Sequence, residues 1–148
     1  MPIPSKIHAQ ELRRISESSY VNKTFKAALV DAPGSDFEAD DAFASIMANE
    51  VEDGLGGYTR QQIGFVQGDI GVYEQGAQPL ARKSAIFEHD GDINEIIRFS
   101  HVVLLAPTED EVVCLAKLAS RAALSDAKSA IFYFDFTLYG VYVADELG

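Results

Sequence analysis

The sequence predicts a mainly β protein: an antiparallel β-sandwich with one or two short helices and extended terminal arms. Two observations favour this fold class. Several short segments alternate apolar and polar residues, and turn signals separate these segments about every dozen residues. With 148 residues the chain is long enough for one domain. We expect an arm and short helix over residues 1–23, the β-rich domain over 24–138, and a C-terminal arm or strand extension over 139–148.

The N-terminal region is predicted to be an arm followed by a short helix and the first strand. Pro2 and Pro4 fix φ and favour extended backbone as far as Ser5. The segment His8–Glu17 carries its few apolar residues on one side of a helix. Alternating residues then predict a strand over Thr24–Val30, which a Pro-Gly turn signal ends.

The middle of the chain is predicted to contain a second short helix and three strands. The helix covers Asp40–Asn49, and the first of these strands covers Tyr58–Val66. Ala81–Glu88 alternates more clearly between its two faces. The Asp-Gly pair at positions 90 and 91 favours a tight hairpin, so Glu95–Leu105 is predicted to be the return strand.

The return strand is predicted to place five residues on one face: Ile97, Phe99, His101, Val103 and Leu105. Its other face begins polar and ends apolar, so we expect one end of the strand to be covered on both sides. Val112–Ala119 fits a strand or a short helix, and its valines favour the strand. Lys128–Leu138 is a further strand, after which Tyr139–Val143 either completes the sheet or forms a terminal arm.

The charge of the chain argues against two classes of partner. Twelve basic and 23 acidic residues give a net charge of −11, and such a surface repels nucleic-acid phosphates and anionic membranes. We therefore expect neither nucleic acid nor a membrane as a partner. Cys114 is the only cysteine, which excludes a disulfide scaffold. The N-terminal residues carry no secretory signal, so synthesis in a cytoplasm is expected.

No pattern of residues in the sequence points to catalysis or to a cofactor. His101 is predicted to be a core histidine, and the alternative is a pH-sensitive contact with a carboxylate or carbonyl partner. Asp90–Asn94 offers oxygen ligands at alternate positions, as a calcium loop does, but Glu95 replaces the required glycine. A turn is the simpler interpretation, and metal binding there stays open. We expect no enzyme, no cofactor, and no catalytic or metal-ligating residue.

The two ends of the chain are the candidate partner-binding surfaces. Extended arms add strands, or lay apolar side chains, onto neighbouring subunits. The candidate contact residues are Pro2, Ile3, Pro4, Tyr139, Tyr142 and Val143.

The order of several segments resembles that of small virion proteins of tailed bacteriophages. The segments are Phe25–Asp31, Asp40–Arg60 with its Gly57-Tyr58-Thr59-Arg60 run, Ala85–Phe87, Ile97–Ala106 and Ala130–Phe136. In those proteins a first strand ending in Leu-Val/Ile-Asp leads to a loop and a short helix. A Gly-Tyr-Ser/Thr-Arg segment and several strands follow. The likeness is one of layout and covers about Thr24 to Phe136.

The resemblance implies a non-enzymatic structural protein of the virion. We expect a head decoration (cement) protein on the capsid exterior, made in the host cytoplasm and bound to the major capsid protein and to copies of itself as a homo-oligomer. The alternatives are a tail, neck or fibre component, and a carbohydrate-binding module. The tyrosines that could stack on sugars are Tyr58, Tyr73, Tyr139 and Tyr142.

Overall fold

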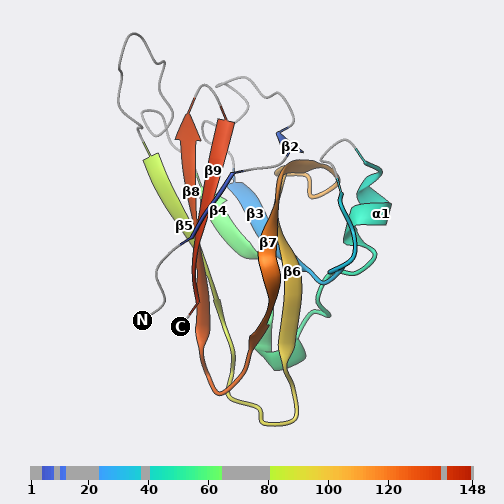
Figure 1. The fold of residues 1–148 in the computed structure, drawn as a ribbon, viewed down its shortest axis with the longest axis vertical. Helices are drawn as coiled ribbons and strands as arrows, with labels where there is room; N and C mark the ends of the chain where they lie inside the picture. The colour runs from blue at the N-terminus through green and yellow to red at the C-terminus, as the bar shows by residue number, and fades with distance from the viewer. Residues whose placement is uncertain are drawn as a thin grey trace.

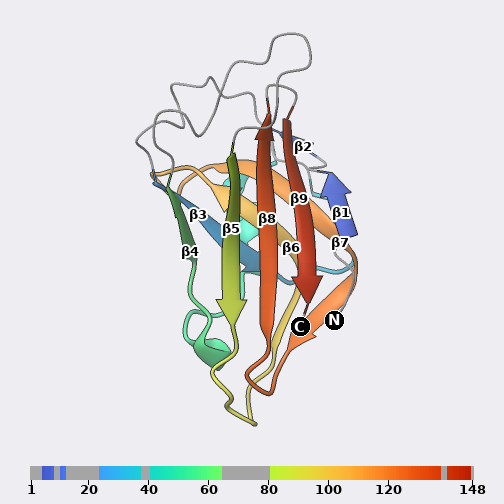
Figure 2. The same cartoon turned by 90° about the vertical axis from the view of Figure 1, so that its left-hand side faces the viewer.

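Two antiparallel sheets face each other across an apolar interior (Figure 1; Figure 2). The computed structural model describes residues 5–8, 11–12, 24–37, 41–64, 81–137 and 140–147. The protein is mainly β, as predicted, and every pairing between its described strands is antiparallel. No helix among the described residues is long and apolar enough to cross a bilayer.

The strands divide into a sheet of four and a sheet of five. The four-stranded sheet has the order β1 (Ser5–His8), β9 (Gly140–Leu147), β8 (Ser129–Thr137) and β5 (Ala81–Glu88). The five-stranded sheet has the order β2 (Glu11–Leu12), β7 (Val112–Leu124), β6 (Ile97–Leu105), β3 (Thr24–Val30) and β4 (Gln61–Gly64). The helical segments are α1 (Phe43–Met47) and a 3₁₀ turn, η2 (Leu55–Gly57).

The main core lies between the sheets and is rich in phenylalanine. Phe132 from β8 meets Phe87 and Phe99 edge-on, with ring centroids 6.0 and 5.9 Å apart. Phe25 from β3 is also fully buried in this cluster. Burying one such side chain is worth about 1.5–3 kcal/mol, so the contact between sheets is a main source of stability.

A second core covers the outer face of the five-stranded sheet. Ala28 and Val30 of β3 and Val103 and Leu105 of β6 pack there against Ile46 of α1. The second half of β6 is therefore buried on both faces, as its apolar pattern predicts. Figure 1 shows α1 on this side of the molecule, away from the four-stranded sheet.

Strand β6 changes face midway, which corrects the face predicted for it. Ile97 and Phe99 point into the core between the sheets, but so do Val102 and Leu104. The pairing of β6 with β7 shifts register between Phe99 and His101, so the alternation is reset there. His101, Val103 and Leu105 consequently lie on the opposite face from Ile97 and Phe99, and the single five-residue face is wrong.

The hairpin predicted at Asp90-Gly91 is also wrong. Strand β5 pairs with β8 in one sheet, whereas β6 pairs with β3 and β7 in the other. The segment between them crosses from sheet to sheet. Gly91 still adopts the left-handed backbone that the pattern anticipates, with φ of 90°.

The N-terminal segment contacts both sheets. Strand β1 pairs with β9, and β2 pairs with β7. The helix predicted over His8–Glu17 is wrong where the structure describes it, because His8, Glu11 and Leu12 lie in strands. A thin apolar stripe could not overcome the backbone hydrogen bonds that the edges of two finished sheets offer.

Other element predictions agree with the structure. Thr24–Val30 and Ala81–Glu88 are strands with the predicted bounds. The helix predicted over Asp40–Asn49 is present as the shorter α1, and the predicted strand over Tyr58–Val66 as the shorter β4. The strand alternative holds for residues 112–119, where β7 continues to Leu124.

The C-terminal segment is an interior strand. Strand β9 lies between β8 and β1, so the backbone at Tyr142 is opposite Asp135 on one side and His8 on the other. Of the two alternatives for this segment, completion of the sheet is the one that the structure has. Pro2, Ile3, Pro4 and Tyr139 lie outside the described residues.

We predict that the two ends differ in their importance for folding. Deleting residues 140–148 removes an interior strand of eight residues, so cooperative thermal unfolding followed by circular dichroism should be lost. Deleting residues 1–12 removes only edge strands of four and two residues, so a cooperative transition should remain. Equal melting of the two truncated chains would contradict this assignment.

Candidate functional site

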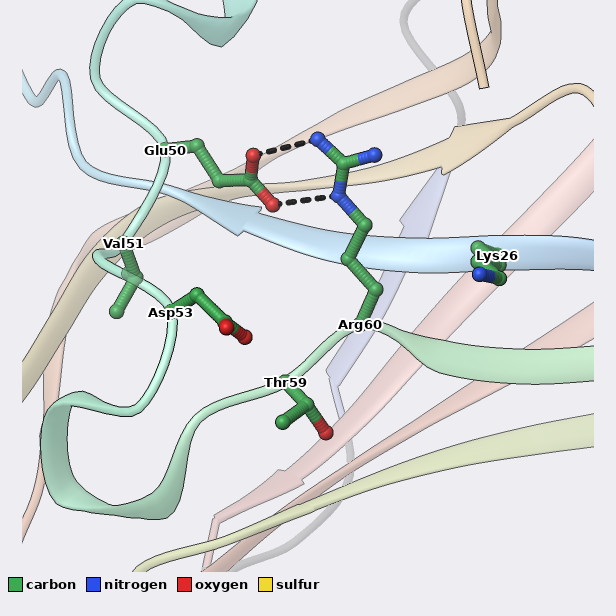
Figure 3. Close-up of a pocket in the computed structure, with 6 residues that line it drawn as sticks. All are labelled: Lys26, Glu50, Val51, Asp53, Thr59 and Arg60. Atoms are coloured by element: carbon green, nitrogen blue, oxygen red, sulfur yellow. Dashed lines mark hydrogen bonds and ion pairs between the residues drawn. The ribbon is translucent and has the colours of Figure 1, made fainter. Parts of the chain in front are cut away.

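A charged pocket of about 380 Å³ lies beside β3 and β4 (Figure 3). It is lined by Lys26, Glu50, Val51, Asp53, Thr59 and Arg60. Backbone hydrogen bonds hold Glu50 and Val51 beside the end of β3. Asp31 N donates to Asn49 O at 2.9 Å, and Val51 N donates to Leu29 O at 3.0 Å.

A bidentate ion pair forms one wall of the charged pocket. Arg60 donates from Nη2 to Glu50 Oε1 at 2.6 Å and from Nε to Glu50 Oε2 at 2.8 Å, as Figure 3 shows. Its remaining nitrogen, Nη1, lies 3.0 Å from Glu109 Oε1, and Lys26 Nζ lies 3.1 Å from the other oxygen of Glu109. Two carboxylates therefore compensate two cations.

The ion pairs shift the pKa values of Arg60 and Glu109. Hydrogen bonds to Glu50 and then to Glu109 outweigh partial burial and raise the pKa of Arg60. Hydrogen bonds from Lys26 and Arg60 lower the pKa of Glu109. Both shifts favour the charged forms of Arg60 and Glu109. The polar atoms of Lys26, Glu50, Arg60 and Glu109 bind one another.

Tyr58 connects the charged pocket to the main core. Its hydroxyl donates to Glu50 Oε2 at 2.8 Å and accepts from Leu29 N at 3.1 Å. Its ring is 2% exposed and stacks on Phe87, and burial raises its pKa. The ring is thus not available to stack on a sugar, which removes Tyr58 from the residues predicted for carbohydrate binding.

The side chains of the charged pocket hold three segments of the chain together and are already paired, which does not favour a ligand-binding site. Arg60, Glu50 and Glu109 join the segment after α1, the start of β4 and the turn after β6. An incoming anion or cation would have to displace a carboxylate or guanidinium that already has its partner. Bidentate arginine–carboxylate pairs of this kind also fix orientation.

We predict that Tyr58→Phe destabilises the fold by about 1–3 kcal/mol, because the buried Leu29 N–H loses its acceptor. Chemical denaturation of both proteins would measure the difference in unfolding free energy. Thr59→Ala is the matched control: Thr59 is the exposed neighbour, so its change should stay within about 0.5 kcal/mol. Equal effects of the two substitutions would contradict the assignment.

A second polar group, Ser100 with His101, lies where β6 changes face. Ser100 Oγ accepts from Ala32 N at 2.7 Å and lies 2.7 Å from His101 Nδ1. The side chains are 3% and 0% exposed, so this serine–histidine pair is closed to a substrate. His101 is a core residue, as predicted, and its ring packs against Phe37 at 5.5 Å between centroids.

Two ion pairs hold the loop that follows β3, residues 31–37, over His101. Lys117 Nζ lies 2.7 Å from Asp36 Oδ1, and Arg121 binds both carboxylate oxygens of Asp31. His101 Nε2 has no hydrogen-bond partner in the described part of the chain. Burial, and then the charge of Lys117, lower the pKa of His101, against smaller opposing effects of the Ser35 backbone, Asp36 and Asp31.

We predict that His101 makes stability depend on pH. Its pKa is lower in the fold than the ordinary 6.5, so the unfolded chain binds more protons as the pH falls through that value. Stability should be greatest above 6.5 and should decrease below it. In denaturation curves measured between about pH 5 and 8, His101→Asn should flatten this slope. Equal slopes for both proteins would contradict the assignment.

Three turns meet at one end of the sandwich, which we call the acidic end: residues 52–57, 89–96 and 125–128. The buried His89 joins them. Its Nε2 donates to Glu95 O at 2.7 Å, while its Nδ1 accepts from Gly91 N and Ala127 N at 2.9 and 3.3 Å. Gly56 is required beside it, because its φ is 58° and an added Cβ would lie 2.9 Å from the imidazole.

The calcium-like segment belongs to this end. Asp90 Oδ1 accepts from Asp92 N at 2.9 Å, and Asp92 Oδ1 accepts from Asn94 N at 2.8 Å. These carboxylates support the backbone of the turn. Among the described residues, no group of three histidine, cysteine, aspartate or glutamate side chains is placed to hold a metal ion.

The predicted partner-binding residues are only partly placed by the structure. Tyr142 and Val143 belong to β9, with backbone partners on both sides. The charged pocket was not predicted, and its members are far apart in sequence: Lys26 and Glu109 are separated by 83 positions. The nearest signal was the Gly57-Tyr58-Thr59-Arg60 run, which contributes two of the pocket's polar groups.

Comparison with known proteins gives no relative: no family model, curated protein or solved structure matches this chain.

Proposed function

We propose that the chain is a non-enzymatic structural protein of a tailed-bacteriophage virion, and specifically a capsid decoration protein that bridges and stabilises capsomers. The observation that carries the proposal is that the polar side chains clustered in the described body form their hydrogen bonds and ion pairs with one another. Arg60 and Glu50 bind each other through two hydrogen bonds. Ser100 Oγ binds Ala32 N and His101 Nδ1 inside the body. Side chains used in this way stabilise a rigid body.

The architecture supports the same role. The N-terminal segment pairs with one strand of each sheet, so it ties the sheets together. Tyr58 and the Glu50–Arg60 pair likewise tie loops to strands. Contacts of this kind, which join the two sheets and hold loops to strands, suit a protein on the surface of a particle. The net charge of −11 suits a position outside the shell, away from packaged DNA.

The proposed partners are the major capsid protein and further copies of this chain. Pro2, Ile3, Pro4 and Tyr139 remain the candidate arm residues for contacts between copies. Tyr142 and Val143 stay candidates within β9, an interior strand with paired backbone on both sides.

The experiment is binding to heads of the encoding phage that were assembled without this protein. The purified chain should cosediment with those heads and saturate at a fixed ratio to the major capsid protein, and its solution mass should be a multiple of 16.1 kDa. A matched control is the chain unfolded and kept in denaturant before dilution. A monomer that stays in the supernatant would contradict the proposal.

A further inference from the structure

The acidic end presents an aliphatic side chain in solvent on a fixed loop. Ile93 is 88% exposed at the tip of residues 89–96, and Ile96 in the same loop is 41% exposed. Single apolar residues are common on protein surfaces and carry little meaning alone. Here hydrogen bonds hold the backbone around the residue in place.

The fixing contacts come from both other turns of the acidic end. Glu95 Oε2 accepts from Gly56 N at 2.5 Å, and Asp90 N donates to Gly56 O at 2.8 Å. On the other side, His89 N donates to Lys128 O at 2.9 Å. A side chain on such a loop loses little conformational freedom when a partner covers it, and pre-organisation of this kind favours binding.

Charge restricts what that partner can be. The three turns contain six acidic residues and one basic residue, Lys128, so this end carries a net −5 of the −11 on the whole chain. Asp53, Asp92 and Asp126 are exposed and form no ion pair with the part of the chain that the structure describes. A second copy of the same end would be repelled, as would a nucleic acid or an anionic membrane.

We propose that the acidic end docks on a partner protein that offers an apolar socket with a basic rim. Ile93 fills the socket, and the carboxylates of Asp92 and Asp126 face the rim. This inference rests on the proposed function and names the part of the molecule that meets the capsid surface.

Binding of five variants to the same heads tests the docking surface. Ile93→Ala should weaken binding about tenfold or more, the size typical of a central apolar contact. Asp126→Asn should bind more weakly at low salt and should lose part of the salt dependence of the wild type.

The remaining variants are matched controls. Ile86→Ala changes an isoleucine that is 42% exposed on the outer face of β5, and Asp110→Asn changes an exposed carboxylate beyond the opposite end of β6. Both should bind within about twofold of the wild type. Ile96→Ala is the third control: a smaller loss than for Ile93→Ala places the contact at the tip. Thermal melting would check that every variant is folded.

Each outcome is decisive. If the wild type binds heads and Ile93→Ala binds equally well, the docking surface is wrong while the proposed function stands. If the carboxylate variant keeps the full salt dependence, the basic rim is wrong. If the wild type fails to bind heads, the proposed function fails, and the docking inference fails with it.

Discussion

Burial of the second half of β6 on both faces is the constraint on which the rest of the structure depends. The strand pairs with β3 and β7 inside one sheet, and its residues contribute to both cores. One face is covered by the four-stranded sheet. The other must be covered by something else, because Val103 and Leu105 would otherwise stand in water at a cost of about 1.5–3 kcal/mol each.

The loop after β3 and helix α1 cover the outer face of β6. The segment after β3 folds back over His101 and is fastened by Lys117 and Arg121. Helix α1 has only five residues, too few to be stable alone, so its packing through Ile46 holds it in place. The Glu50–Arg60 pair then ties the end of this cover to β4. The charged pocket therefore lies where the cover of the second core meets β4.

The parts predictable from sequence were those governed by local alternation. The bounds of Ala81–Glu88 could be predicted, and so could its faces over residues 84–88, which alternate between solvent and core. The face of β6 could not, because its second half is apolar on both sides and alternation there carries no information about register. The crossing between β5 and β6 failed for a different reason: an Asp-Gly pair predicts the local turn, while the sheet that each strand joins depends on distant partners.

The candidate sites follow the same division. The turn at Asp90–Asn94 and the burial of His101 were predictable because neighbours in sequence determine them. The meeting of Lys26, Arg60 and Glu109 depends on how β3, β4 and the turn after β6 are arranged. No spacing in the sequence encodes that arrangement, and an acidic chain offers too many carboxylates for composition to select Glu109.

The pairing of β1 with β9 joins the two ends of the described chain. In chain order β1 is made first of the described strands and β9 last, so β1 has no partner in its sheet until β9 has been made. The four-stranded sheet can therefore be completed only when β9 is in place, and until then β1 can pair with other sheet edges. Closure of this sheet is thus a late step in folding, because the strand that joins β1 to β8 is the last of the described strands to be made.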